Sequence, residues 1–157
     1  MKIGLIAMSG VRAYNEELTE LGLTLPGFVD RNKIIASLPS LGLLTLAGMT
    51  PDRVKVEYIE IADIKNVDKL PNSFDLVAIS TYSAQIFEAY ELSERYRKKG
   101  IKTVIGGPHV TSLPEEAKEH CDSVVIGEGE PTWLELLNDC QKGDLKSFYT
   151  SFDKKLD

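Results

Sequence analysis

Cysteine and histidine are scarce in this chain of 157 residues, and their scarcity removes several classes of function. Cys121 and Cys140 stand alone, with neither the spacing of a zinc site nor the number that a disulfide framework needs. Isolated thiols of this kind are typical of a reducing compartment, which favours a cytoplasmic location. His109 and His120 are the only histidines, and neither has a serine or cysteine partner in a nucleophile motif. The sequence therefore offers no catalytic residue and no metal-ligand set.

The chain also lacks an excess of positive charge and any long apolar run. Its 18 Lys and Arg residues stand against 24 Asp and Glu residues, which gives a formal net charge of −6. A negative chain without a basic stripe argues against binding to nucleic acid or to anionic membrane. No run approaches the ~18 apolar residues that a membrane span needs. We therefore expect one globular domain that binds neither nucleic acid nor membrane.

Five short apolar runs predict five β-strands. The run Val54–Ile61 alternates between apolar and polar residues, so we expect that strand near an edge of the sheet. The other four are almost continuously apolar, as in parallel strands that are buried on both faces. These four are Lys2–Ala7, Leu76–Ser80, Lys102–Ile105 and Ser123–Ile126.

Helical patterns separate the predicted strands. They cover Leu41–Met49, Ser83–Lys99, Leu113–Glu119 and Pro131–Cys140, and the nearly all-apolar Leu41–Met49 is expected to be well buried. Alternating strands and helices predict an α/β fold of the flavodoxin-like (Rossmann-type) class, a three-layer sandwich with a five-stranded parallel sheet in the order 2-1-3-4-5. We expect this domain to span residues 1–142, with residues 143–157 as a docking tail or a linker.

Small residues gather where the predicted strands end. The loops after four of the strands read MSG, STYSAQ, GGPH and GEGEP, and the carboxyl ends of parallel strands are where such sheets bind ligands. In addition, 33 residues (8–40) separate the first strand from the first clear helix, and a long insertion at this place is usually functional. The loops contain no GxGxxG dinucleotide motif, no P-loop and no paired acids of a phospho-acceptor domain.

Two of these loops carry a family resemblance. GGPHVTSLPEEA (residues 106–117), followed by DSVVIGEGEPTWLELL (122–137), resembles the cobalamin-binding domains that precede radical S-adenosylmethionine (radical SAM) domains. LPSLGLLTLAG (38–48) and FDLVAISTYSAQ (74–85) are similar to other segments of that family. The resemblance implies cobalamin held base-off, with its corrin over the strand ends and its nucleotide tail in a slot beside the sheet.

One element of that family is missing. Its best-known members carry a DxHxxG loop after the first strand, and the histidine of this loop ligates cobalt. The corresponding loop here, MSGVRAYN, contains no histidine. Members joined to radical SAM domains commonly lack this ligand, and they often use cobalamin as a methyl carrier. The same absence also fits a member that has lost cofactor binding.

The resemblance assigns roles to the loop residues. Glycines allow a ring or a tail to lie against backbone, Pro108 stiffens its turn, and hydroxyl groups offer hydrogen bonds to the tail. Glu128 and Glu130 are candidates for bonds to corrin amides or ribose, or else acids that favour the start of a helix. Tyr82 is either a wall of the slot or a core residue, and His109 is either functional or held for packing. The implied cofactor-binding set is Ser9, Gly10, Ser80, Thr81, Tyr82, Ser83, Gly106, Gly107, Pro108, His109, Gly127, Glu128, Gly129 and Glu130.

The chain itself is not expected to be the catalyst. A [4Fe–4S] cluster needs several thiolates, and the radical SAM motif CxxxCxxC is absent. The resemblance therefore implies a downstream radical SAM domain of methyltransferase type in the same polypeptide. Two alternatives stay open: a non-catalytic docking or regulatory module without cofactor, and a small enzyme that binds a phosphorylated or nucleotide ligand on the same loops.

Overall fold

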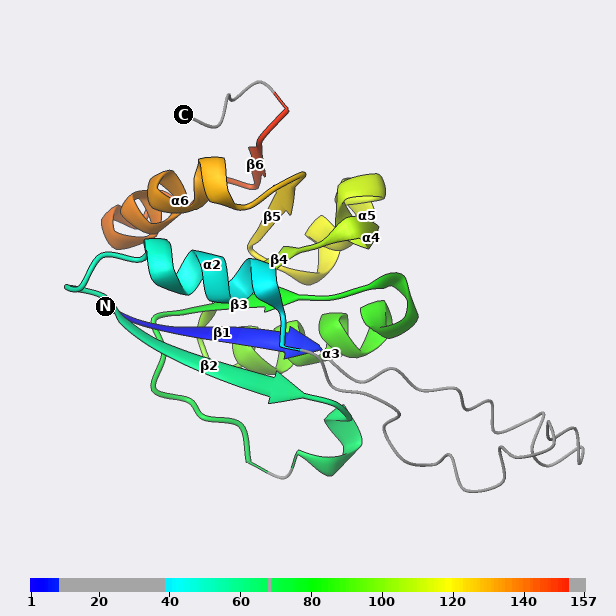
Figure 1. The fold of residues 1–157 in the computed structure, drawn as a ribbon. Coiled ribbons are helices and arrows are strands. Elements are labelled where there is room, and N and C mark those ends of the chain that lie inside the picture. Colours follow the sequence, from blue (N-terminus) through cyan, green and yellow to red (C-terminus); the bar gives the residue numbers. More distant parts are fainter. Residues whose placement is uncertain (9–38, 68, 153–157) are drawn as a thin grey trace, which may run out of the picture.

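A parallel β-sheet organises the chain. The computed structural model describes residues 1–8, 39–67 and 69–152, and within them the sheet has six strands in the order β2-β1-β3-β4-β5-β6 (Figure 1). All five strand pairs are parallel. The predicted order of the first five strands is confirmed, and β2 lies at an edge. The strands are β1 (Lys2–Met8), β2 (Lys55–Ile61), β3 (Leu76–Ser80), β4 (Lys102–Gly106), β5 (Ser123–Ile126) and β6 (Phe148–Thr150).

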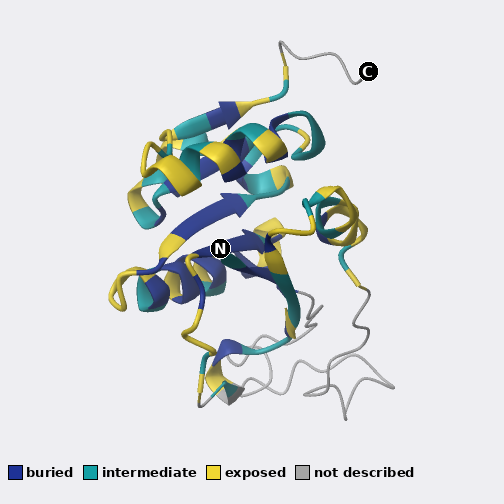
Figure 2. Cartoon of the chain, turned by 90° about the vertical axis from the view of Figure 1, so that its left-hand side faces the viewer, coloured by how far each residue is buried: buried dark blue, intermediate teal, exposed yellow. Residues whose placement is uncertain are grey.

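Helices cover both faces of the sheet, which confirms the three-layer sandwich. On one face lie α2 (Leu41–Met49) and α6 (Glu130–Lys142), and on the other lie α3 (Ile86–Arg97), α4 (Pro108–Ser112) and α5 (Pro114–His120). Two short 3-10 helices, η1 (Ile64–Asn66) and η2 (Ser83–Gln85), follow β2 and β3. Successive strand side chains alternate between two buried clusters, one on each face. Figure 2 shows the inner strands largely in the buried colour, whereas the helices carry exposed residues on their outer surfaces.

The sixth strand lies in residues 143–157, where the sequence shows no clear period. Gly143 ends α6 with φ +81°, the left-handed conformation that glycine adopts readily. The chain then turns back, and β6 pairs with β5 at the end of the sheet (Figure 1). Tyr149 is buried there and its hydroxyl donates a hydrogen bond to Asp139 Oδ2 at 2.9 Å. This segment therefore contributes to the sheet, and a strand of three residues is too short to show a sequence pattern.

The prediction that Leu41–Met49 is well buried is wrong. The segment does form α2, with the Ser40 hydroxyl accepting a hydrogen bond from the Leu43 N–H, but only Leu43 is buried. Leu41 is 77% exposed, and Leu44 and Met49 are also exposed. A helix at the outer layer contacts the sheet along one stripe only, so apolar composition alone does not decide how much of it is buried.

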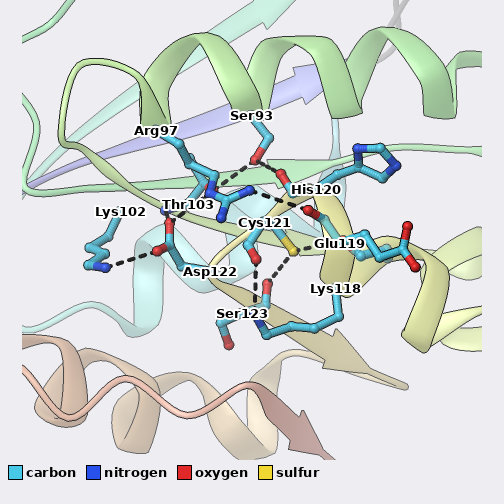
Figure 3. A network of polar contacts seen from close by, with 11 residues as sticks. Ser93, Arg97, Lys102, Thr103, Lys118, Glu119, His120, Cys121, Asp122 and Ser123 are labelled. Atoms are coloured by element: carbon cyan, nitrogen blue, oxygen red, sulfur yellow. Dashed lines mark hydrogen bonds and ion pairs between the residues drawn. The ribbon is translucent and has the colours of Figure 1, made fainter.

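A polar cluster holds the amino ends of β4 and β5 together (Figure 3). Asp122 accepts hydrogen bonds from Lys102 Nζ at 2.9 Å and from the Thr103 N–H at 3.0 Å, and Arg97 Nε lies 3.8 Å from it. Burial raises the pKa of the Asp122 carboxyl, but these hydrogen bonds and the two cations outweigh it and hold the pKa below its ordinary value of 3.8. In the same cluster, burial raises the pKa of the Cys121 thiol to about 11, so this cysteine is an inert core residue.

Asp122→Asn is expected to lower the free energy of unfolding by about 1 kcal/mol at pH 7, because the amide keeps the shape but loses the charge. A carboxyl with a depressed pKa stabilises the fold above its unfolded pKa, and this contribution is lost as the pH falls through the folded pKa. The difference between wild type and variant should therefore shrink as the pH falls below 3.8 and disappear once the carboxyl is protonated in the folded protein as well. Urea unfolding at several pH values measures this difference in the free energy of unfolding, and Asp52→Asn, at an exposed position, is the control. A difference that persists at low pH would contradict this account.

Candidate functional site

The alternation of side chains brings three of the predicted residues to one face of the sheet. Ala78, Val104 and Val125 belong to the buried cluster beneath α2 and α6. Because side chains on a strand repeat their direction every two residues, Ser80 and Gly106 face the same side. Two residues beyond Val125 comes Gly127, at the same edge. The carboxyl ends of β3, β4 and β5 therefore present one hydroxyl and two glycines toward the layer formed by α2 and α6.

A cavity of about 210 Å³ occupies this place. Residues of β3, β4 and β5 line one side of it, and residues of α2 and α6 line the other. Seven predicted residues line it together with apolar residues of the core. The predicted ones are Ser80, Gly106, Gly107, Gly127, Glu128, Gly129 and Glu130, and the others are Gly42, Leu43, Leu46, Ala78, Ile79, Val104, Val125 and Trp133.

The two glycines of GGPH serve different purposes. A Cβ added to Gly106 would meet only Val125 Cβ, at an ordinary 3.7 Å, so the fold itself does not require glycine at this position. A Cβ on Gly107 would lie 2.3 Å from the Thr81 carbonyl oxygen, and the φ of Gly107 is +126°. The fold therefore requires glycine at position 107, because the backbone of this residue lies against the backbone of Thr81 and leaves no space for a side chain. Gly106, in contrast, keeps the cavity open.

Pro108 turns the chain from β4 directly into a helix. Gly107, before it, has an extended ψ of 176°, and Pro108 is the first residue of α4. The sequence predicts a loop at GGPH, so α4 is a helix that was not predicted. Thr111 of this helix accepts a hydrogen bond from the Gly127 N–H at 3.0 Å, which ties the end of α4 to the loop after β5.

The GEGE loop, residues 127–130, closes one end of the cavity. Gly127 has a φ of +81°, and Gly129 lies so close to α2 that an added Cβ would be 3.3 Å from Leu46 Cδ1. Glu130 is the first residue of α6, where an acid favours the helix start, so both interpretations of this residue remain open. The loop joins β5 to α6 while approaching both α2 and the end of β6.

Trp133 forms the inner wall of the cavity. Its ring is 1% exposed, and its Nε1–H donates a hydrogen bond to Thr50 Oγ1 at 2.8 Å. The Thr50 hydroxyl in turn donates to the Leu46 carbonyl at 2.7 Å. This chain of bonds connects α6 to the end of α2 and fixes the width of the cavity between them.

The structure places five predicted residues outside the cavity lining. Thr81 is buried, and its hydroxyl donates to the Tyr82 carbonyl. Tyr82 is 65% exposed, so it is not a core residue, and Ser83 beside it is exposed as well. Tyr82 and Ser83 thus stand on the surface just after Ser80, the last residue of β3, which does line the cavity. Pro108 and His109 lie on α4, while Ser9 and Gly10 fall outside the described residues.

His109 faces the opposite layer of the molecule. Its Nε2 lies 3.4 Å from Glu116 Oε1, and the same oxygen accepts a hydrogen bond from the Tyr90 hydroxyl at 3.0 Å. Burial and this bond to Glu116 raise the pKa of Tyr90 well above its ordinary value, so the phenol stays neutral. His109 thus takes part in packing between α3, α4 and α5, on the far side of the sheet from the cavity.

A larger hollow, of about 460 Å³, lies at the other end of the sheet. Charged side chains that already pair with one another line it, as in the contacts of Asp122 with Lys102 and Arg97. The amino ends of parallel strands are not where such folds bind ligands. The smaller cavity, which unites two glycine loops at the carboxyl ends, is therefore the better candidate.

Several residues of the candidate site were not predicted from the sequence. Leu46 and Trp133 lie in segments that the sequence predicts as helices, and both line the cavity. Thr111 and Ser151 hold the GEGE loop through hydrogen bonds to its backbone. The printed sequence contains no signal for the last two, because a lone hydroxyl residue has no spacing that marks its partner.

Comparisons with known proteins show which sequences this chain resembles. Residues 29–137 match the family described as B12 binding domain. The chain is 36% identical over 116 residues to bacteriochlorophyllide d C-8(2)-methyltransferase of Chlorobaculum tepidum, which covers 73% of this chain and 25% of that protein. It is 34% identical to the bacteriochlorophyllide d C-12(1)-methyltransferase of the same organism, in an alignment that covers 76% of this chain and 26% of that protein. It is also 34% identical to an uncharacterised methyltransferase of Pyrococcus horikoshii, in an alignment that covers 67% of this chain and 25% of that protein. The chain thus spans about a quarter of the length of these relatives.

Proposed function

This chain belongs to the B12 binding domain family, and from that membership we propose that it holds cobalamin base-off at the carboxyl ends of β3, β4 and β5. The observation that carries the proposal is the cavity beneath α2 and α6. At about 210 Å³ it is too small for a whole corrinoid but suits one narrow arm of it. The nucleotide tail is such an arm, and the corrin would remain outside, over the strand ends.

The residues of the cavity fit the tail chemically. Leu43, Val104 and Trp133 offer apolar contact for the flat base, and the Ser80 hydroxyl can bond to its polar groups. The absence of a side chain on Gly106 leaves room for the tail against the backbone of β4. Tyr82 and Ser83 are exposed just after the end of β3, where a corrin over the strand ends would cover them. Bound cobalamin would supply a cobalt centre able to carry a methyl group.

We infer further that the domain works inside a longer protein. Three relatives, of which the matched segment covers only about a quarter, are named methyltransferases, so a methyl-transfer role for the whole protein follows from them by analogy. The likeness of GGPH and GEGE to domains that precede radical SAM domains supports a radical SAM partner in the same polypeptide. This chain would bind and orient the cofactor, and the partner would hold the [4Fe–4S] cluster and S-adenosylmethionine. A CxxxCxxC motif in the same polypeptide would support that arrangement.

A titration with cobalamin tests the proposal. Trp133 is the only tryptophan in the chain and lines the cavity, so hydroxocobalamin should quench its fluorescence in a saturable way. Methylcobalamin should change from its red base-on form to its yellow base-off form on binding. Cobinamide, which lacks the nucleotide tail, should bind at least tenfold more weakly, because the loss of even 1.4 kcal/mol of contacts has that effect.

The same titration separates the alternatives. Neither quenching nor a spectral change at high micromolar cofactor would contradict cobalamin binding and leave the docking or regulatory module as the better interpretation. Equal affinity for cobalamin and cobinamide would contradict the placement of the tail in the cavity.

A further inference from the structure

Two successive backbone amides of the GEGE loop are held by side chains from opposite directions. The Gly127 N–H donates to Thr111 Oγ1 of α4 at 3.0 Å. The next amide, the Glu128 N–H, donates to Ser151 Oγ at 2.8 Å. Ser151 follows β6 directly, so a loop that lines the cavity is fixed on one side by the last part of the chain that the structure describes.

Ser151 is itself well anchored. Its backbone N–H donates to the Ile126 carbonyl at 3.1 Å, and its hydroxyl lies 3.4 Å from the same oxygen. The hydroxyl can therefore donate to Ile126 while it accepts from Glu128, which uses both of its hydrogen-bonding roles. The pairing of β6 with β5 brings Ser151 to this position.

Gly127 leaves the space that Ser151 needs. A Cβ on Gly127 would lie 2.3 Å from Ser151 Oγ, so any side chain there would push the hydroxyl away from the Glu128 amide. The glycine and the serine thus form one unit, although 24 positions separate them in the sequence. The family resemblance, in contrast, implies that Gly127 contacts the cofactor directly.

We propose that Ser151 is a positioning residue for the cofactor loop: it holds the Glu128 amide and thereby sets the shape of the GEGE loop at the mouth of the cavity. This inference rests on the proposed binding of cobalamin. Ser151, which lies in the segment that the sequence suggests as a tail or linker, would thereby support the binding site.

Ser151→Ala tests the inference, with Ser147→Ala as its matched control. Ser147 is exposed in the same segment, and its backbone carbonyl, which the substitution leaves in place, accepts the bond from the Val124 N–H. Ser151→Ala should weaken cobalamin binding about tenfold, as expected for the loss of one hydrogen bond to a loop amide. It should also speed hydrogen exchange at the Glu128 amide in the cofactor-free protein. Ser147→Ala should change neither, and Ser151→Thr, which retains a hydroxyl, should restore both.

The outcomes separate this inference from the proposed function. If wild type fails to bind cobalamin, the proposed function and the positioning role fail together, whatever the exchange data show. If wild type binds and Ser151→Ala binds equally well, only the positioning role is contradicted. Weaker binding accompanied by an equally large loss of global stability, without selective exchange at Glu128, would show a general structural effect and would also overturn the inference.

Discussion

Replacing Gly107 by alanine is expected to lower the free energy of unfolding by about 3 kcal/mol or more, a large share of the stability of a domain of this size. The added Cβ would lie 2.3 Å from the Thr81 carbonyl oxygen, and a φ of +126° is strained for any residue with a side chain. Because the obstacle is backbone, no side-chain rotation can relieve it. The loop after β3 and the start of α4 would have to separate. Urea unfolding followed by circular dichroism measures the effect.

Gly100→Ala is the control for this substitution. Gly100 also has a positive φ, +77°, but an added Cβ there would have no heavy atom within 4 Å. It should therefore show the conformational strain alone, about 1 kcal/mol. A loss of stability at Gly107 no larger than that at Gly100 would show that the close approach to Thr81 does not constrain the fold.

Gly106→Leu is expected to abolish cobalamin binding, with a loss of affinity of more than a hundredfold, while the domain stays folded. Gly106 opens onto the cavity, and its Cβ would make only an ordinary contact of 3.7 Å with Val125. A leucine side chain would fill much of the space of about 210 Å³ that the tail is proposed to occupy. The free energy of unfolding should change by less than about 1 kcal/mol, because the new side chain is apolar and enters an apolar space. Quenching of Trp133 reports binding, and urea unfolding reports stability.

Two controls sharpen the Gly106 experiment. Cobinamide has no tail, so its weaker binding should be the same in wild type and in Gly106→Leu. Gly48→Leu makes the same change on α2, at an exposed glycine that does not line the cavity, and should bind cobalamin like wild type. Cobalamin binding of wild-type strength in Gly106→Leu would show that the tail does not enter the cavity.

Local pattern was sufficient for most of the architecture. The near-continuous apolar runs predicted β1, β3, β4 and β5, and the alternating run predicted β2 at an edge, because burial on one or two faces leaves a period that the residues record. Parallel strands end at one edge of a sheet, so the order of the strands also predicted that GGPH and GEGE would meet. Seven of the predicted residues do line one cavity.

Features that depend on distant contacts were not predictable in this way. Only packing shows that most of α2 is exposed, that His109 faces the opposite layer, and that β6 extends the sheet. The sequence of an apolar helix is the same whether its outer face is covered by other residues or exposed to solvent. The sequence GGPH likewise does not show toward which face of the sheet the chain turns after Pro108.

The amino-acid sequence by itself determined the class of fold and the family to which the loops belong, and it predicted the edge of the sheet at which the candidate site lies, since each depends on short-range pattern or on motif. The tertiary structure alone decided what each small residue does there. The missing side chain of Gly106 leaves the cavity unfilled. The missing side chain of Gly107 lets the Thr81 carbonyl approach, and that of Gly127 leaves space for the Ser151 hydroxyl. The reason is physical: glycine marks a place where something comes close, but only the folded chain shows whether that neighbour is a ligand, the backbone or another side chain.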